Sequence, residues 1–159
     1  MKRVILARDL MSRPVKRLTA RARVRDAGAF LLRNGISGAP VEDEHGRWMG
    51  VFTLNDLARA VATLPEAVEV ERTLEAREPV PADPGSVPVA DHMSAGMVTV
   101  FPDATLAEIV RSMVGSDVHR VFVVEGDTGE LVGVITTLDI LKWLDGIRIE
   151  TGASRSEAR

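Results

Sequence analysis

Gly50-Val51-Phe52-Thr53-Leu54-Asn55-Asp56 is the stretch that decides the fold, because it returns as Gly133-Val134-Ile135-Thr136-Thr137-Leu138-Asp139. In both copies a short apolar run ends on a threonine, and an aspartate follows three positions later. An apolar run of this length predicts a buried strand, and Thr-x-x-Asp is typical of the first turn of a helix. Each copy therefore predicts a strand that leads directly into a helix.

Two further blocks repeat in the same order. Asp9-Leu10-Met11-Ser12 returns 82 residues later as Asp91-His92-Met93-Ser94, and residues 36–41 align with 118–123 at the same offset. Three blocks in register predict an internally duplicated chain. The expected boundaries are a first repeat at 7–61, an acidic, proline-containing connection at 62–88, a second repeat at 89–144 and a C-terminal tail at 145–159.

Each repeat is predicted to run helix, strand, strand, helix. In the second repeat Thr105 and Glu108 form a capping box before a helix whose buried face carries Leu106, Ile109, Val110 and Met113. Val24, Ala27 and Leu31 carry the same face in the first repeat. Apolar runs at 39–41 and 47–52, and at 120–124 and 131–135, predict paired strands. The fold class is therefore α+β, with two pseudo-symmetric repeats packed through their sheets as one module.

Composition limits the functions to consider. The chain has 159 residues, no cysteine and a net charge of −3, which excludes thiolate chemistry and argues against general nucleic-acid binding. No apolar run approaches the ~20 residues that a membrane span needs, so we expect a cytoplasmic protein with no membrane partner.

Charge is unevenly distributed. Residues 1–33 hold ten basic against two acidic side chains, or +8, whereas residues 66–91 hold seven acidic against two basic ones, or −5. These are either two solvated surfaces or an electrostatic dock. Within the connection, 66–77 is compatible with a short acidic helix, while the prolines at 79, 81, 84 and 88 exclude regular helix after it.

The Thr-x-x-Asp motifs allow two interpretations. Every helix needs a cap, and this pattern supplies one. A helix N-terminus also suits a phosphate, a threonine hydroxyl can donate to that phosphate, and an aspartate one turn on can accept bonds from both hydroxyls of a ribose. The candidate residues are Thr53, Asp56, Thr136 and Asp139.

The segment before the first strand of each repeat is a second candidate. Ile36, Ser37, Gly38 and Ala39 are small or apolar and leave backbone groups accessible to a flat base. Val118, His119 and Arg120 stand at the equivalent place, where arginine suits phosphate oxygens. The three histidines are scattered without metal-ligand spacing, so no metal is expected. No nucleophile is paired with a base, so we expect no catalytic residues and no enzyme.

Together, in order and twice, these blocks resemble the cystathionine β-synthase (CBS) domain family. The resemblance implies two clefts between the repeats that bind AMP, ADP, ATP or S-adenosylmethionine, and a disc-like homodimer. It implies that Asp56 and Asp139 bind the ribose, that Thr53 and Thr136 lie on the phosphate side, and that residues 36–39 line the base in one cleft. Residues 118–120 occupy the equivalent place in the other cleft, where His119 and Arg120 are similar to a phosphate-contacting pair in some members. The family usually has a proline at this strand position, which Pro40 keeps in the first repeat and Phe122 replaces in the second. The bulk of Phe122 is expected to narrow the second cleft, so that the two sites bind unequally.

The sequence thus predicts a non-catalytic regulatory module for energy sensing, whose adenosyl ligand changes its association with an effector protein or another copy of the chain. The alternative is a constitutive interaction and dimerisation module with empty clefts. A nucleotide-hydrolysing enzyme is the third hypothesis, and the absence of a paired base and nucleophile disfavours it.

Overall fold

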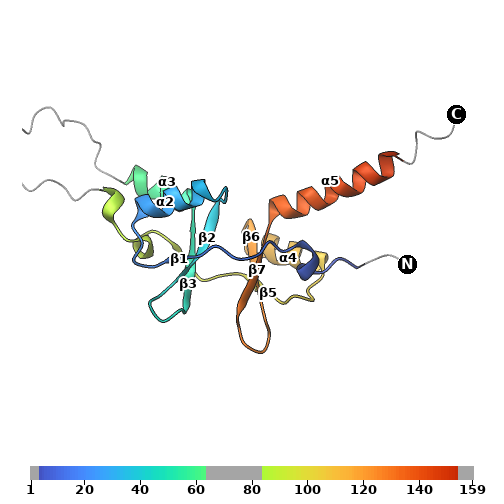
Figure 1. The fold of residues 1–159 in the computed structure, drawn as a ribbon, viewed down its shortest axis with the longest axis horizontal. Coiled ribbons are helices and arrows are strands. Elements are labelled where there is room, and N and C mark those ends of the chain that lie inside the picture. Colours follow the sequence, from blue (N-terminus) through green and yellow to red (C-terminus); the bar gives the residue numbers. More distant parts are fainter. Residues whose placement is uncertain (1–3, 64–83, 154–159) are drawn as a thin grey trace, which may run out of the picture. The chain divides into compact units, whose positions relative to one another are not determined.

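The computed structural model describes residues 4–63 and 84–153, which form two compact units (Figure 1). The first-repeat unit contains residues 16–63 and 84–97, and the second-repeat unit contains residues 4–15 and 98–153. The acidic helix predicted at 66–77 and the end of the predicted tail, 154–159, lie outside the described residues.

The first-repeat unit confirms the predicted order of helix, strand, strand and helix. Its elements are β1 (Leu18–Thr19), α2 (Val24–Arg33), β2 (Gly38–Glu42), β3 (Trp48–Thr53), α3 (Leu54–Ala62), the short helical turns Pro84–Ser86 and Val89–Asp91, and β4 (Ser94–Ala95). The sheet has the order β1-β2-β3-β4, in which β1 is parallel to β2 and the other pairs are antiparallel. Strands β1 and β4 were not predicted, because two residues are too few to show a periodicity.

The second-repeat unit repeats this plan. Its elements are α1 (Ala7–Leu10), β5 (Thr99–Val100), α4 (Leu106–Gly115), β6 (Arg120–Val124), β7 (Leu131–Thr136) and α5 (Thr137–Ala153), with sheet order β5-β6-β7. The β2–β3 and β6–β7 pairs share an irregularity at equivalent places, at Val41/Glu42 and Val123/Val124. Helix α5 continues past residue 144, where we expected a tail to begin, and no proline interrupts it before Ala153.

Each unit has its own hydrophobic core, which the helices cover on one face of the sheet. In the first-repeat unit the predicted face of α2 packs against Ala39, Val41 and Phe52. In the second-repeat unit Ile109 and Met113 of α4 pack against alternate residues of β6. Val110 is 39% exposed, contrary to the prediction, because it stands about 100° around the helix from Ile109.

The two entry motifs pack on the opposite repeat from the one they precede in sequence. Ser12 lies in the second-repeat unit, where its N–H donates to the Val134 carbonyl oxygen at 2.9 Å and its own carbonyl accepts from the Val134 N–H at 3.1 Å. Ser94 lies in the first-repeat unit and pairs with Val51 of β3. The compact units are therefore built differently from the repeats that the sequence defines.

This crossing explains the glycine that opens each repeated stretch. A Cβ on Gly50 would lie 2.1 Å from the carbonyl oxygen of Ser94, and one on Gly133 would lie 2.8 Å from the Cβ of Met11. Neither place has room for a side chain. The glycines are thus required by the segments that pass beside them, β4 at Gly50 and the end of α1 at Gly133.

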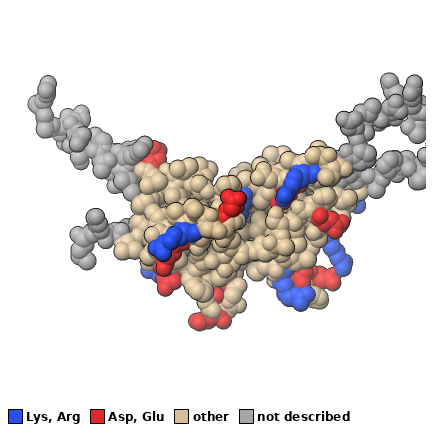
Figure 2. Space-filling model, turned by 180° about the vertical axis from the view of Figure 1, so that it is seen from behind, with Lys and Arg blue, Asp and Glu red and all other residues tan. Residues whose placement is uncertain are grey.

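Charged side chains of both signs are interspersed on the face drawn in Figure 2. Two arginines of the basic N-terminal stretch pair with acids of their own unit: Arg17 with Glu42 at 3.2 Å and Arg21 with Glu44 at 2.8 Å. These contacts agree with ordinary solvated surfaces, while most of the acidic stretch lies outside the described residues. In the described part of the chain, no helix combines the length and the apolar character that a membrane crossing requires.

Candidate ligand-binding site

Both Thr-x-x-Asp motifs form the same capping box. The Asp56 Oδ2 accepts from the backbone N–H and the hydroxyl of Thr53, both at 2.7 Å, and the Asp56 N–H donates to the Thr53 hydroxyl oxygen at 3.3 Å. Thr136 and Asp139 make the same three contacts at 2.7, 2.7 and 3.3 Å. The capping interpretation is therefore confirmed in both repeats, and it uses only one oxygen of each carboxylate.

Capping also occupies groups that were candidates for a phosphate. Each threonine donates its hydroxyl proton to the aspartate, so a bond from that hydroxyl to a phosphate requires the hydroxyl to rotate. The first N–H of α3 donates to the Ser37 carbonyl oxygen, and that of α5 to the His119 carbonyl oxygen, each at 3.0 Å. The phosphate role of Thr53 and Thr136 remains a prediction.

The same contacts bring each predicted base-lining segment to the motif of its own unit. Gly38 pairs with Thr53 across β2 and β3, and Arg120 pairs with Thr136 across β6 and β7. In both units the segment therefore lies beside the end of the strand that leads into the capped helix. The backbone of 36–39 and of 118–120 thus lies beside the Thr-x-x-Asp motif of the same unit, while a shared role of these residues in ligand binding stays a prediction.

Exposure separates the members of these segments. Ser37 and His119 are exposed, and Ile36, Gly38, Val118 and Arg120 are half-buried. Ala39 is fully buried in the core of its unit. Pro40 and Phe122 are also buried, at the strand position between two residues that face their core.

The two carboxylates differ sharply in their surroundings. Asp56 is 1% exposed; its Oδ1 forms an ion pair with Arg59 and lies 3.4 Å from the Ser94 hydroxyl. Asp139 is half-buried, and among the described residues its Oδ1 has no hydrogen-bond or ion-pair partner. The contact of Arg59 with Asp56 could have been predicted from the sequence, since side chains three apart on a helix are neighbours. The contact of Ser94 with Asp56 could not have been predicted in this way, because the two residues are 38 positions apart in the sequence.

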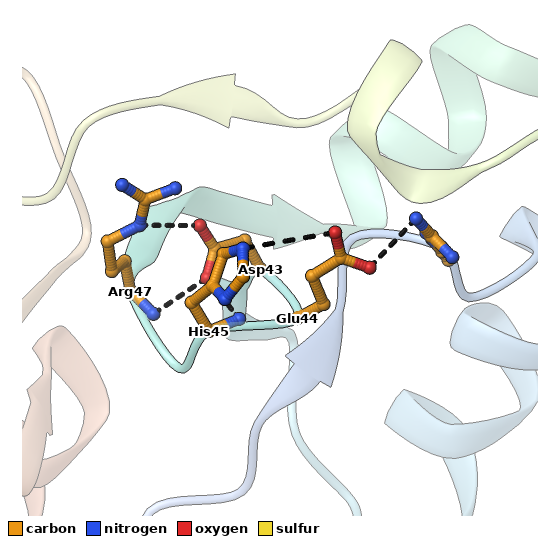
Figure 3. A network of polar contacts seen from close by, with 5 residues as sticks. Asp43, Glu44, His45 and Arg47 are labelled. Carbon is orange, nitrogen blue, oxygen red and sulfur yellow. Dashed lines mark hydrogen bonds and ion pairs between the residues drawn. The ribbon is translucent and has the colours of Figure 1, made fainter.

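Other charged groups gather at the turn between β2 and β3 (Figure 3). Asp43 accepts from the backbone N–H and the guanidinium of Arg47, at 2.9 and 2.8 Å, and from the His45 N–H at 2.8 Å. The bond from the Arg47 N–H, aided by that guanidinium and by the His45 N–H, lowers the pKa of Asp43 from 3.8 to about 2. These contacts stabilise the turn between β2 and β3.

The turn lines a surface hollow of about 420 Å³ with residues 19–21, and an equivalent hollow of about 430 Å³ lies between 101–103 and 125–126 beside Arg8. Neither is lined by the predicted site residues. Within residues 4–63 and 84–153, no group of three or more histidine, aspartate or glutamate side chains is arranged to hold a metal ion.

Comparison with known proteins gives the class to which this architecture belongs. The family model described as "CBS domain" matches residues 7–63 and 89–146. The chain therefore belongs to the CBS domain family and carries two copies of the domain, as the repeated motifs predict. The chain is 25% identical over 122 residues to the L-aspartate semialdehyde sulfurtransferase of Methanocaldococcus jannaschii, covering 75% of this chain but only 23% of that protein.

Solved structures share the paired fold. The CBS domain pair of protein MJ0100, in complex with 5′-methylthioadenosine and S-adenosyl-L-methionine, has a TM-score of 0.71 and 22% identity, and the match covers 91% of this chain and 98% of that one. The CBS domain protein PAE2072 from Pyrobaculum aerophilum, complexed with AMP, has a TM-score of 0.67 and 23% identity, with 85% and 89% covered. At these identities the likeness establishes the fold.

Proposed function

We propose that the protein is a non-catalytic regulatory module that binds an adenosyl ligand at its Thr-x-x-Asp motifs and thereby changes its association with a partner. The ligand class is AMP, ADP, ATP or S-adenosylmethionine. One observation carries the proposal: Asp139 caps α5 through Oδ2 alone, while Oδ1 has no partner among the described residues. This oxygen is an acceptor on a half-buried carboxylate that Thr136 holds through its other oxygen.

The chemistry of this motif fits a nucleoside. An ionised carboxylate only accepts hydrogen bonds, so its natural ligand is a pair of neighbouring hydroxyls such as a ribose diol. Arg120 begins β6 and pairs with Thr136 across β6 and β7. We propose that its guanidinium binds the phosphate of the ligand, because guanidinium groups donate two parallel bonds to phosphate. The adenine base is proposed from the ligands that family members MJ0100 and PAE2072 carry.

A second face of each repeat supports self-association. Large apolar side chains on the helices of both repeats are exposed, and several occupy equivalent positions. They are Leu32, Val61, Val114, Leu138, Leu141 and Leu144. Exposed apolar faces of this kind mark protein interfaces. A homodimer through the helices, with an effector protein as a further partner, is part of the proposal, and sedimentation of a Leu141→Glu, Leu144→Glu variant tests it by yielding a monomer.

Calorimetry on the full chain with AMP, ADP, ATP and S-adenosylmethionine tests ligand binding. Asp139→Asn keeps an oxygen that accepts from Thr136 but removes the charge, so binding should weaken about tenfold or more, or ~1.4 kcal/mol. Asp103→Asn is the matched control, since Asp103 lies in the hollow away from the motif and should leave affinity unchanged.

Regulation needs a second measurement. A ligand shifts an equilibrium only through different affinities for the two states, so the sedimentation coefficient of the wild-type chain, or its capture of the effector, should change when saturating ligand is added. If no ligand gives heat and association is the same with and without nucleotide, the constitutive interaction module replaces the sensor. Turnover of ATP that Asp139→Asn abolishes would instead indicate an enzyme.

A further inference from the structure

We infer that Arg59 controls access to the first Thr-x-x-Asp motif, so that the two motifs bind the adenosyl ligand unequally and the second fills first. The inference rests on the proposed function and adds to it an order of filling and the residue that sets that order. Two carboxylates with identical capping contacts but different surroundings provide the evidence.

In the first motif both carboxylate oxygens are already engaged. Thr53 uses Oδ2 twice, and the Arg59 guanidinium pairs with Oδ1, with the Ser94 hydroxyl at 3.4 Å. The whole Asp56 residue is 1% exposed. A ribose diol therefore finds no acceptor here until the guanidinium moves away.

Among the described residues, no side chain plays the part of Arg59 in the second motif. The equivalent residue on α5 is Lys142, which makes no ion pair within the described residues. Ser12, the equivalent of Ser94, is held by backbone bonds to Val134, and no bond from its hydroxyl to Asp139 is formed in the described part of the chain. Asp139 consequently presents its second oxygen without any rearrangement.

The Arg59 pair can open, which makes it a gate rather than a permanent block. The Arg59 side chain is 70% exposed, so it can leave the carboxylate and remain hydrated. An equilibrium of this kind raises the apparent Kd by the inverse of the open fraction: a pair open about one-tenth of the time weakens binding about tenfold.

The best probe is 5′-methylthioadenosine, because it carries the diol but no phosphate. A phosphorylated ligand would give the released guanidinium a new partner and would mask the effect. Calorimetry starts from full-length Asp139→Asn, in which only the first motif keeps its charge. Adding Arg59→Gln should raise its affinity for methylthioadenosine about tenfold. Adding Lys142→Gln, the matched control, should leave it unchanged.

Arg59→Lys in the same Asp139→Asn chain gives the first motif the lysine that the second motif has at this position. This variant replaces Arg59→Gln in the test if the glutamine variant fails to fold. It should also raise the affinity, since lysine is more strongly hydrated and lacks the planar fork. Wild-type titrations should show a stronger site that Asp139→Asn removes. Unchanged or weaker binding in the Arg59 variants overturns the inference. The inference is also overturned if Asp56→Asn, rather than Asp139→Asn, removes the stronger site. That result would favour narrowing of the second site by Phe122.

Failure of the inference and failure of the proposed function look different. Two sites of equal affinity, both insensitive to Arg59, refute the gate and leave the adenosyl-binding module intact. No heat from methylthioadenosine or from any of the four ligands above, with wild-type or variant chains, refutes the module and the gate with it.

Discussion

Replacing each motif aspartate by alanine should destabilise the two units by different amounts, even without ligand. The capping contacts are the same in both motifs, so each substitution loses a cap worth about 1 kcal/mol. Asp56→Ala also loses the pair with Arg59. The carboxylate is 1% exposed, but the Arg59 side chain is 70% exposed, so solvent screening limits this pair to about 1–2 kcal/mol. The expected losses are about 2–3 kcal/mol for Asp56→Ala and about 1 kcal/mol for Asp139→Ala.

The two tryptophans allow each unit to be followed separately. Trp48 begins β3 of the first-repeat unit, and Trp143 lies on α5 of the second-repeat unit. Urea unfolding is read by fluorescence, with Asp56→Ala in a Trp143→Phe chain and Asp139→Ala in a Trp48→Phe chain, each against its parent. Unchanged m-values show that the comparison is one of stability. If Asp56→Ala costs no more than Asp139→Ala, the Arg59 pair does not hold the carboxylate and the reasoning fails.

Two further predictions concern the scaffold. Gly50→Ala puts a Cβ 2.1 Å from the Ser94 carbonyl oxygen and should cost more than about 2 kcal/mol in thermal melts. Gly115→Ala, in open space at the end of α4, should be neutral or stabilising by up to ~1 kcal/mol, and similar losses in the two variants would contradict the crossing. Because the pKa of Asp43 is lowered from 3.8 to about 2, it contributes stability above pH ~4 that is lost as pH falls through about 2. Asp43→Asn should lack that part of the acid sensitivity in urea unfolding, and equal acid profiles would refute it.

The fold was predictable where the sequence carries periodicity or repetition. The capping boxes at Thr53, Thr105 and Thr136, the paired strands and the buried face of α2 are all local patterns, and the structure has each of them. Repetition strengthened the prediction, because each block had to serve the same purpose twice. What the sequence predicted well is therefore what short-range physics decides.

Contacts between residues far apart in the sequence could not be predicted. Nothing local indicates that Ser12 bonds to Val134 of the other repeat, or that Ser94 passes beside Gly50. The glycines alone pointed to some close approach, without naming what approaches. For the same reason the sequence placed Asp9–Ser12 with the first repeat, while its contacts lie with the second.

Capping and ligand binding are compatible interpretations of the Thr-x-x-Asp motif, and the capping contacts show how much of each carboxylate the cap uses. A carboxylate has about four acceptor positions, and the cap needs those of one oxygen only. Whether the other oxygen can bind a ligand depends on what else reaches it. We propose that in this chain the residue three positions further along the helix decides it, arginine after Asp56 and lysine after Asp139. Two motifs with the same pattern can therefore differ in function, and a comparison that stops at the aspartate misses the difference.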